Sequence, residues 1–415
     1  MTQPQQTDIA IIGAGPAGST AAALLRQSGW RVTVIERSHF PRFSIGESLL
    51  PQCMEFLHKA GLLEAVKAAA FQVKNGVRFV EGDQRGHFDF SEQHSNGWDW
   101  TWNVVRADFD QILATQAAAQ GADIRFGESI TAVDFSTPGA PRLHVATEDG
   151  EQYAIDARFV CDASGFGRVL SKLLDLQCAV DAPPRATIFT HIMDNLTSED
   201  ARDGTLLCIH PQHPDVWYWM IPFQGGRTSV GVVGDPELIN AQPGEPLHKL
   251  QGLIAQEPNL AHLLAAADYD HPVTHLSSYA KGVTRLHGRD FVLLGNAGGF
   301  LDPMFSSGVT IALKSSVLAS ALIDRQLRGQ AADWDTDFAT PLRTGIRVFD
   351  AYIRAWYAGQ LKHVFFKDTP HRRIRSMIGS ILAGYVWDQN NPYVARPQQR
   401  LQALCHTCAP AQSSA

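Results

Sequence analysis

Near its start the chain places a glycine-rich turn between a short apolar strand and a helix, an arrangement that few folds accommodate. The turn reads Gly13-Ala14-Gly15-Pro16-Ala17-Gly18. It follows the apolar run 8–12, its helix continues to about Gln27, and a second apolar run at 32–35 ends on Glu36. Backbone amides of such a turn approach a pyrophosphate at a helix N-terminus, and an acidic residue about 20 positions later accepts from ribose hydroxyls. The segment predicts a βαβ unit that binds a dinucleotide through these glycines and Glu36.

A strand-and-turn pattern of the same kind returns late in the chain. The apolar run 291–294 is followed by the glycine-rich run 295–299, after short alternating runs between 185 and 235 that predict an antiparallel sheet. We therefore predict an α/β fold: a Rossmann-like nucleotide domain, an inserted antiparallel-sheet substrate domain and a helical C-terminal segment. The predicted division is 1–80 with 101–184 and 276–335 for the nucleotide domain, 81–100 with 185–275 for the sheet, 336–408 for the helices, and 409–415 for a flexible tail.

The composition excludes several classes of protein. The 415 residues carry a formal net charge of -7, whereas a nucleic-acid surface needs clustered Lys and Arg. The first residues lack the regions of a signal peptide, and we identify no run of about 18 apolar residues. Six scattered cysteines do not suggest a disulfide framework, and the C-x-x-C pair Cys405 and Cys408 lacks further zinc ligands nearby. We expect a cytoplasmic protein with no nucleic-acid partner and no membrane insertion.

Three further stretches bear on which dinucleotide is bound. They are Val105-Arg106-Ala107-Asp108-Phe109-Asp110, Cys161-Asp162-Ala163-Ser164-Gly165, and the run from Gly295 to Asp302. Together they resemble the flavin monooxygenase superfamily with the p-hydroxybenzoate hydroxylase fold. The resemblance implies FAD, with Arg106 on the cofactor, Asp162 closing the nucleotide domain, and Asp302 with the following helix start under the flavin. It also places Ala17, Arg37, Ser48 and Gly295 at the cofactor.

Two features of the chain qualify how FAD is held and reduced. Asn296 stands where the superfamily usually has an Asp that accepts from a ribityl hydroxyl. Its carbonyl still accepts, but the charge-assisted bond is lost, which weakens binding by about 1 kcal/mol. The chain also has no second G-x-G-x-x-G for a resident nicotinamide. Reduced FAD is therefore expected from a separate flavin reductase or from transient NAD(P)H.

Three motifs resemble the flavin-dependent halogenases. They are the run from Phe40 to Pro51 around Gly46-Glu47-Ser48, the run Trp217-Tyr218-Trp219-Met220-Ile221-Pro222, which fits W-x-W-x-I-P, and the run from Leu301 to Val309. The stretches 381–384 and 391–394 resemble the same branch, so the match covers nearly the whole chain. The resemblance implies an enzyme that makes hypohalous acid from a flavin hydroperoxide and a halide ion, chloride or bromide, and halogenates an electron-rich aromatic ring.

These motifs supply the candidate catalytic residues. Trp217 and Trp219 would wall the route of hypohalous acid; the alternative is ordinary aromatic packing on a sheet. Lys74 matches the halogenase lysine by its position, and would hydrogen-bond hypohalous acid or form a haloamine. The alternative for Lys74 is a solvated surface lysine. Ser307 and Gly308 offer backbone amides in a small-residue turn that suits a halide ion.

Phe305 narrows the expected substrate, because tryptophan halogenases have a glutamate in the corresponding loop. Free tryptophan is therefore not expected. The expected substrate is a phenol or a pyrrole, either as a small molecule or as an acyl group on a carrier protein. Two other functions stay open: an aromatic monooxygenase or geranylgeranyl-reductase-like flavin oxidoreductase, against which W-x-W-x-I-P counts, and a flavoprotein that only binds its cofactor or a carrier.

Overall fold

A parallel sheet forms the centre of the molecule in the computed structural model, which describes residues 4–196, 202–277, 279–366 and 372–408. Its strand order is β20-β12-β2-β3-β8. The strands are β2 (Ile9–Ile12), β3 (Val32–Glu36), β8 (Asp123–Phe126), β12 (Phe159–Asp162) and β20 (Phe291–Leu293). All pairs in this sheet are parallel, with α1 (Pro16–Gln27) between β2 and β3, so the predicted βαβ unit is confirmed.

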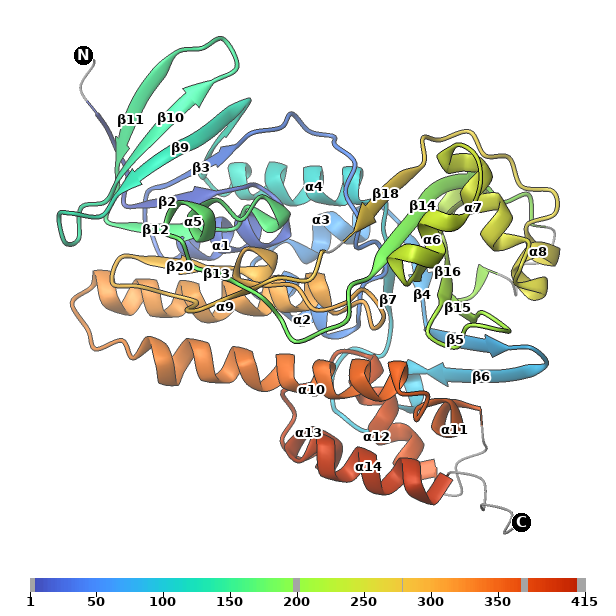
Figure 1. The fold of residues 1–415 in the computed structure, drawn as a ribbon. Coiled ribbons are helices and arrows are strands. Elements are labelled where there is room, and N and C mark those ends of the chain that lie inside the picture. The colour runs from blue at the N-terminus through green and yellow to red at the C-terminus, as the bar shows by residue number, and fades with distance from the viewer. Residues whose placement is uncertain (1–3, 197–201, 278, 367–371, 409–415) are drawn as a thin grey trace.

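Both faces of this sheet are covered, which explains its continuous apolar strands. Ile9 and Ile11 belong to the same core as the helices α1, α4 (Arg106–Ala119) and α9 (Ser307–Leu327). Ala10 and Ile12 point the other way, into a small core shared with a four-stranded sheet of order β1-β11-β10-β9 (Figure 1). The strands of that sheet are β1 (Gln5–Gln6), β9 (Glu128–Asp134), β10 (Arg142–Thr147) and β11 (Gln152–Asp156).

A second large sheet of seven strands stands beside the nucleotide-binding part, in the order β18-β14-β17-β16-β15-β5-β6. Its strands are β5 (Gly76–Glu81), β6 (Gln84–Asp89), β14 (Ala186–Met193), β15 (Thr205–Ile209), β16 (Trp217–Pro222), β17 (Arg227–Gly234) and β18 (Thr274–Ser277). The antiparallel pairing of β14, β16 and β17 confirms the predicted sheet. The sheet takes in β5, which starts before the predicted boundary at 81, and the division into domains otherwise stays a prediction.

The alternation along β16 gives the seven-stranded sheet two different faces. Trp217, Trp219 and Ile221 face the core that contains α1 and α9. Tyr218 and Met220 face a separate core. That core is closed by α6 (Pro236–Ala241), α7 (Pro246–Ile254) and α8 (Pro258–Leu263). The two tryptophans of the W-x-W-x-I-P motif therefore share a face because the side-chain period of a strand is two.

Helices make up the C-terminal part, as expected for 336–408, while the predicted tail 409–415 lies outside the described residues. They are α10 (Thr340–Tyr357), α11 (Lys362–Phe365), α12 (Arg372–Leu382), α13 (Pro392–Ala395) and α14 (Pro397–Cys408). α10 lies along α9 below the central sheet (Figure 1). Cys405 and Cys408 are buried on α14, and the described residues contain no cluster of three or more metal-ligating side chains.

One helix among the described residues, α9, has the length and mean hydropathy, 1.2, of a membrane-spanning segment. This helix is not an uninterrupted apolar run, because Lys314, Asp324, Arg325 and several serines lie within it. Of that stretch, 67% is buried inside the molecule, where α9 packs on α1, α2 (Gln52–Lys59) and α10. A buried core helix passes the same test of length and composition.

Candidate active site

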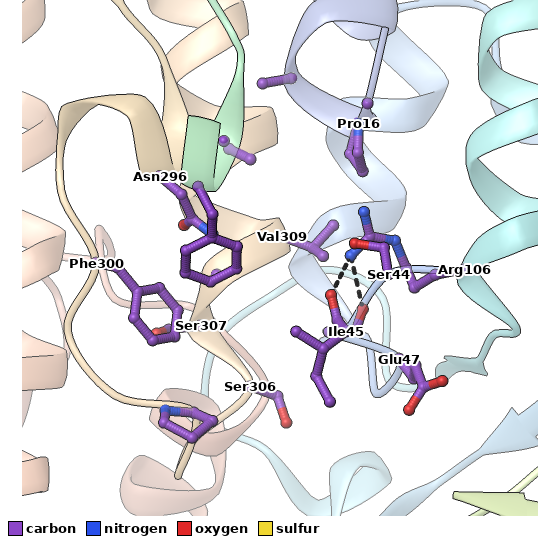
Figure 2. Close-up of a pocket in the computed structure, with 18 of the residues that line it drawn as sticks. Pro16, Ser44, Ile45, Glu47, Arg106, Asn296, Phe300, Ser306, Ser307 and Val309 are labelled. Atoms are coloured by element: carbon purple, nitrogen blue, oxygen red, sulfur yellow. Dashed lines mark hydrogen bonds between the residues drawn. The ribbon is translucent and has the colours of Figure 1, made fainter. Parts of the chain in front are cut away.

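A cavity of about 440 Å³ lies where the parallel sheet, the seven-stranded sheet and α9 meet. Its wall combines the glycine turn, the segments 36–38 and 42–48, Arg106, the loop 163–167, strands β15 and β16, and the start of α9. Figure 2 shows the N-terminal parts of α1 and α9, the segment 44–47 and Arg106 around one space. Predicted residues far apart in the sequence therefore gather at one site.

The glycine turn is packed so closely that side chains cannot replace two of its glycines. Gly13 has a φ of +98°, and a Cβ there would lie 2.7 Å from the Ala163 carbonyl oxygen. A Cβ on Gly18 would lie 1.8 Å from the Gly13 oxygen. Gly15 lines the cavity, and a Cβ there would meet the Arg42 guanidinium at 3.4 Å. Gly13 and Gly18 thus hold the turn against β12 and α1, while Gly15 leaves the cavity open.

Glu36 secures the other end of the nucleotide site. Its carboxylate accepts from the Ala14 amide at 2.8 Å and from the Ser38 amide at 3.0 Å, and it lines the cavity with Arg37. Among the described residues no side chain caps the first turn of α1, so its amides remain available. Amides at a helix N-terminus beside a carboxylate suit the pyrophosphate and ribose of a dinucleotide, so the residues fit FAD.

Arg106 is held by a buried carboxylate. Its Nε and Nη2 donate to the two Asp110 carboxylate oxygens at 2.7 and 2.8 Å, and Asp110 is fully buried. Nη1 of Arg106 donates to the carbonyl oxygens of Ile45 and Gly46 (Figure 2). Arg42 shares Asp110 at 3.2 Å. Bidentate pairing fixes the guanidinium plane, so Arg106 orients the segment 42–48 along the cavity.

The start of α9 forms the opposite wall. Ser306, at its N-cap, has a φ of +53°, and among the described residues no side chain caps the helix. Ser307 and Gly308 line the cavity with Asn296, whose side-chain oxygen lies 3.9 Å from the position of a Cβ on Gly308. The first amides of a helix favour negative charge. The geometry therefore suits an anion or an electron-rich ring edge at this end.

A chain of hydrogen bonds connects the tryptophan wall to the loop before α9. The Trp217 Nε1 donates to the Tyr357 hydroxyl at 3.0 Å, and that hydroxyl donates to an Asp302 carboxylate oxygen at 2.9 Å. Burial raises the pKa of Asp302 to about 6. The Trp219 Nε1 donates to the Ser229 hydroxyl at 3.0 Å. Both indoles are thus fixed in orientation, and both line the cavity.

Lys74 is not a surface lysine. It lies on β4 (Gln72–Lys74), is only 2% exposed, and its Nζ donates to the Leu49 carbonyl at 2.9 Å and lies 5.4 Å from the Phe90 ring centroid. Burial lowers the Lys74 pKa to about 7. Neutral amine and ammonium therefore coexist near neutral pH, which suits either role expected for it. Lys74 stands behind the cavity wall rather than in it.

Other predicted residues also support the site without lining the cavity. Asp162 accepts from the amides of Ser164 at 2.9 Å and Leu170 at 2.7 Å, and burial raises its pKa. Gly295 has a φ of +52°, and a Cβ there would lie 2.9 Å from the Ala312 Cβ. Gly18, Asp302 and Lys74 are likewise behind the wall. Ala17 and Ser48 line it, and Ser48 bonds the Thr205 hydroxyl of β15 at 2.8 Å.

Sequence reasoning missed one pair of residues in the site. The Glu47 carboxylate lies 2.5 Å from the His191 Nε2, and both side chains are buried. Glu47 lines the cavity, whereas His191 comes from β14. The Gly-Glu-Ser motif singled out Glu47 as part of a family pattern. Nothing in the sequence around His191 marks it as the partner of Glu47.

The fold and this cavity define a class: FAD-binding oxidoreductases with the p-hydroxybenzoate hydroxylase fold. The model of the FAD binding domain family matches residues 6–345. A tryptophan 2-halogenase from Chondromyces crocatus is 31% identical over 363 residues, which cover 86% of this chain and 67% of that protein. The chain belongs to the flavin-dependent halogenases and is an FAD-dependent enzyme.

Two further relatives extend the comparison. A 1H-pyrrole-2-carbonyl-[peptidyl-carrier protein] chlorinase from Pseudomonas fluorescens is 29% identical over 88% of this chain and 87% of its own length. A solved flavoprotein/dehydrogenase from Cytophaga hutchinsonii is 40% identical, with a TM-score of 0.94 and coverage of 97% of this chain and 99% of that chain. The resemblance therefore extends over essentially the whole chain.

Proposed function

We propose that this enzyme halogenates an electron-rich aromatic ring, a phenol or a pyrrole, with FAD reduced by a separate flavin reductase. One observation carries the proposal. The two indoles of the W-x-W-x-I-P strand line the same cavity as the glycine turn and the start of α9. An aromatic-walled chamber is therefore continuous with the nucleotide site, as transfer of a diffusible oxidant requires.

Each part of the cavity has a separate task in this proposal. The glycine turn, Glu36 and Arg106 hold FAD, which when bound and reduced supplies the oxidising equivalent from oxygen. Amides of 307–308 hold the halide. We assign the action on hypohalous acid to Lys74, whose amine lies behind the cavity wall on the Leu49 carbonyl and has to reach the cavity for this step, and the fixed indoles keep that oxidant away from water.

The loop before α9 also bears on the choice of substrate. Phe305 is 6% exposed and packs against the rings of Tyr352 and Trp356, both at 6.4 Å between centroids, so it does not line the cavity, whereas its neighbours Met304 and Ser306 do. The loop therefore brings no carboxylate to the cavity that would orient an amino acid. We infer that phenols and pyrroles are better substrates than free tryptophan, and that the pyrrole is a candidate for delivery on a carrier protein, as in the Pseudomonas relative.

Product analysis tests the proposal. The purified protein, FAD, a flavin reductase, NADH and bromide are incubated with phenols, pyrroles, a carrier-bound pyrrole and tryptophan, and mass spectrometry searches for the bromine isotope pattern. Bromination that needs both the protein and bromide supports the proposal. Hydroxylated or dehydrogenated products that form equally well without halide would instead support a monooxygenase or a dehydrogenase, the latter being the name of the Cytophaga relative.

A further inference from the structure

One oxygen of the Glu47 carboxylate is left without a partner inside the cavity wall. Glu47 is only 2% exposed and lines the cavity. Its Oε1 contacts His191, while its Oε2 is buried and meets no hydrogen-bond partner among the described residues. A buried carboxylate oxygen without a donor is unfavourable by about 1–3 kcal/mol, so its presence calls for a partner or a catalytic role.

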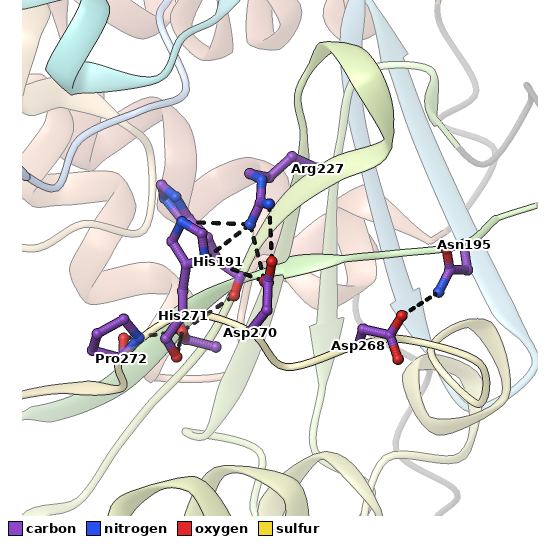
Figure 3. A network of polar contacts seen from close by, with 8 residues as sticks. His191, Asn195, Arg227, Asp268, Asp270, His271 and Pro272 are labelled. Atoms are coloured by element: carbon purple, nitrogen blue, oxygen red, sulfur yellow. Dashed lines mark hydrogen bonds and ion pairs between the residues drawn. The ribbon is translucent and has the colours of Figure 1, made fainter.

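His191 is positioned tightly enough to orient that carboxylate. Its ring lies 5.4 Å from Phe43 and 5.3 Å from Phe223, measured between centroids. The Thr190 hydroxyl lies within 3.0–3.2 Å of the carbonyl oxygens of His191, His271 and Pro272, which are alternative acceptors for its single proton and hold the backbone behind the ring. Figure 3 shows His191, His271 and Pro272 together. The imidazole therefore has one narrow range of positions, and Glu47 Oε1 is bound to it.

The charged groups around the pair are already neutralised. Arg227 pairs with Asp270 through both guanidinium ends at 3.0 Å, and this pairing lowers the pKa of Asp270 to about 2. His271 bonds Arg227 at 2.9 Å (Figure 3). Arg106, on the other side, is occupied by Asp110. None of these described cations donates to Glu47 Oε2, so this oxygen is available to accept from a bound molecule.

The position of Glu47 indicates which ligand. Figure 2 shows it on the opposite side of the cavity from Asn296 and Phe300, away from the candidate halide amides. Because a carboxylate repels a halide ion, Glu47 and the halide site have to be separated if one cavity is to contain both. The neighbouring Ser48 is bonded to Thr205 on β15, next to the tryptophan strand. Glu47 thus lies in the part of the cavity wall that is joined to the tryptophan strand.

We propose that Glu47, oriented by His191, is a catalytic base that accepts the hydroxyl proton of a phenolic substrate. The inference rests on the proposed function and narrows its substrate class to rings that carry an acidic O–H. Removal of that proton raises electron density at the ortho and para carbons. Halogenation then proceeds at these carbons.

The phenol proton passes to Glu47 Oε2, the ring π electrons form the carbon–halogen bond, and the halogen–oxygen bond of hypohalous acid breaks. Hydroxide leaves, and a neutral dienone remains. The hydroxide then takes the ring proton and becomes water, which restores the aromatic ring as a phenolate, and Glu47 returns its proton to the phenolate oxygen. The sum is phenol plus hypohalous acid giving halophenol plus water.

A comparison of a phenol with its methyl ether tests the assignment, because the ether has the same ring but no proton to give. Single-turnover bromination of both compounds is measured for wild type and Glu47→Gln, with exposed Glu64→Gln as the matched control. We expect Glu47→Gln to lower the phenol rate about 10²-fold, the usual contribution of a general base, and to leave the ether rate within about threefold. Equal losses for both compounds would overturn the proposal.

Two binding measurements complete the design. Quenching of tryptophan fluorescence, with two indoles in the wall, gives the phenol Kd without turnover, and FAD stoichiometry is read from absorbance. Glu47→Gln should keep FAD and weaken phenol binding more than ether binding. Loss of FAD would instead assign Glu47 to the cofactor and overturn the proposal. His191→Asn should reproduce the same selective loss, since it leaves the carboxylate without its orienting imidazole.

Failure of this inference can be told apart from failure of the proposed function. If wild type brominates no phenol or pyrrole, the proposed function fails. If wild type brominates the phenol and Glu47→Gln does so with an unchanged phenol-to-ether ratio, only the role of Glu47 fails.

Discussion

Replacing Lys74 with Met tests whether the buried amine serves the halogenation reaction rather than the stability of the fold. Met has a similar length and no charge. Burial lowers the Lys74 pKa from 10.5 to about 7. At about 1.4 kcal/mol per pKa unit, that difference corresponds to ~5 kcal/mol of unfavourable free energy for the ammonium in the folded state. The variant loses the bond to the Leu49 carbonyl, which costs ~1–3 kcal/mol.

The pH dependence of this difference has a definite sign. Because the folded pKa is lowered, the unfolded chain binds more protons between pH 7 and 10.5, and wild-type stability rises with pH across that window. Lys74→Met should therefore be more stable than wild type by ~2 kcal/mol at pH 7. As the pH approaches 10.5 the penalty on wild type disappears, and the variant should become the less stable protein, since only its lost hydrogen bond remains.

Denaturant unfolding of the FAD-loaded proteins at pH 7, 8, 9 and 10 measures this difference, with exposed Lys172→Met as the control. The same samples are assayed for bromination and for oxygen consumption. We expect bromination to fall by about 10²-fold or more while FAD binding and oxygen consumption stay near wild type. Lys74→Arg should not restore bromination, because a guanidinium does not form a haloamine.

Two results would refute this reasoning. A stability difference that stays constant with pH would show that the Lys74 amine is not desolvated as the structure has it. Bromination at the wild-type rate in Lys74→Met would make the residue structural.

Three other variants and one bromide soak test separate parts of the site. Gly15→Val should lose stoichiometric FAD with a melting temperature of the FAD-free protein close to wild type, because the branched side chain enters the cavity; retention of FAD would show that the pyrophosphate lies elsewhere. Bromide soaked into crystals should give anomalous density at the amides of 307–308, and density only elsewhere near the flavin would defeat that assignment. Tyr357→Phe should lower the free energy of unfolding by ~1–3 kcal/mol, because Trp217 loses its hydrogen-bond acceptor and Asp302 loses its donor. An unchanged unfolding curve would count against a stabilising role for these two hydrogen bonds. The raised pKa of Asp302 in the folded state favours its protonated form, so the free energy of unfolding of wild type should fall as the pH rises from about 4 to about 6. Asp302→Asn should lack this fall, and denaturation across that pH range measures the difference.

Local sequence patterns were sufficient to predict the βαβ unit, the tryptophan strand and the residues at the cofactor end of the site. The strand, the glycine turn and Glu36 lie within one stretch of chain, and a positive φ at Gly13 or a tight approach at Gly18 excludes larger residues regardless of distant contacts. The alternation of Trp217 and Trp219 likewise follows from the period of a strand. These constraints act between neighbours in the chain, so the sequence alone revealed them.

Burial and long-range pairing were decided only by the tertiary structure. The residues around Lys74 do not show whether its amine is exposed or desolvated, because desolvation depends on Phe90 and on the chain at Leu49. Glu47 and His191 are separated by 144 residues, and Trp217 and Tyr357 by 140. A hydrogen bond between such residues exists only after separate sheets and helices pack together. The sequence by itself therefore determined the class of cofactor and the strand that carries the indoles. Packing determined which cavity-lining carboxylate keeps an oxygen without a hydrogen-bond partner among the described residues, and which lysine is desolvated.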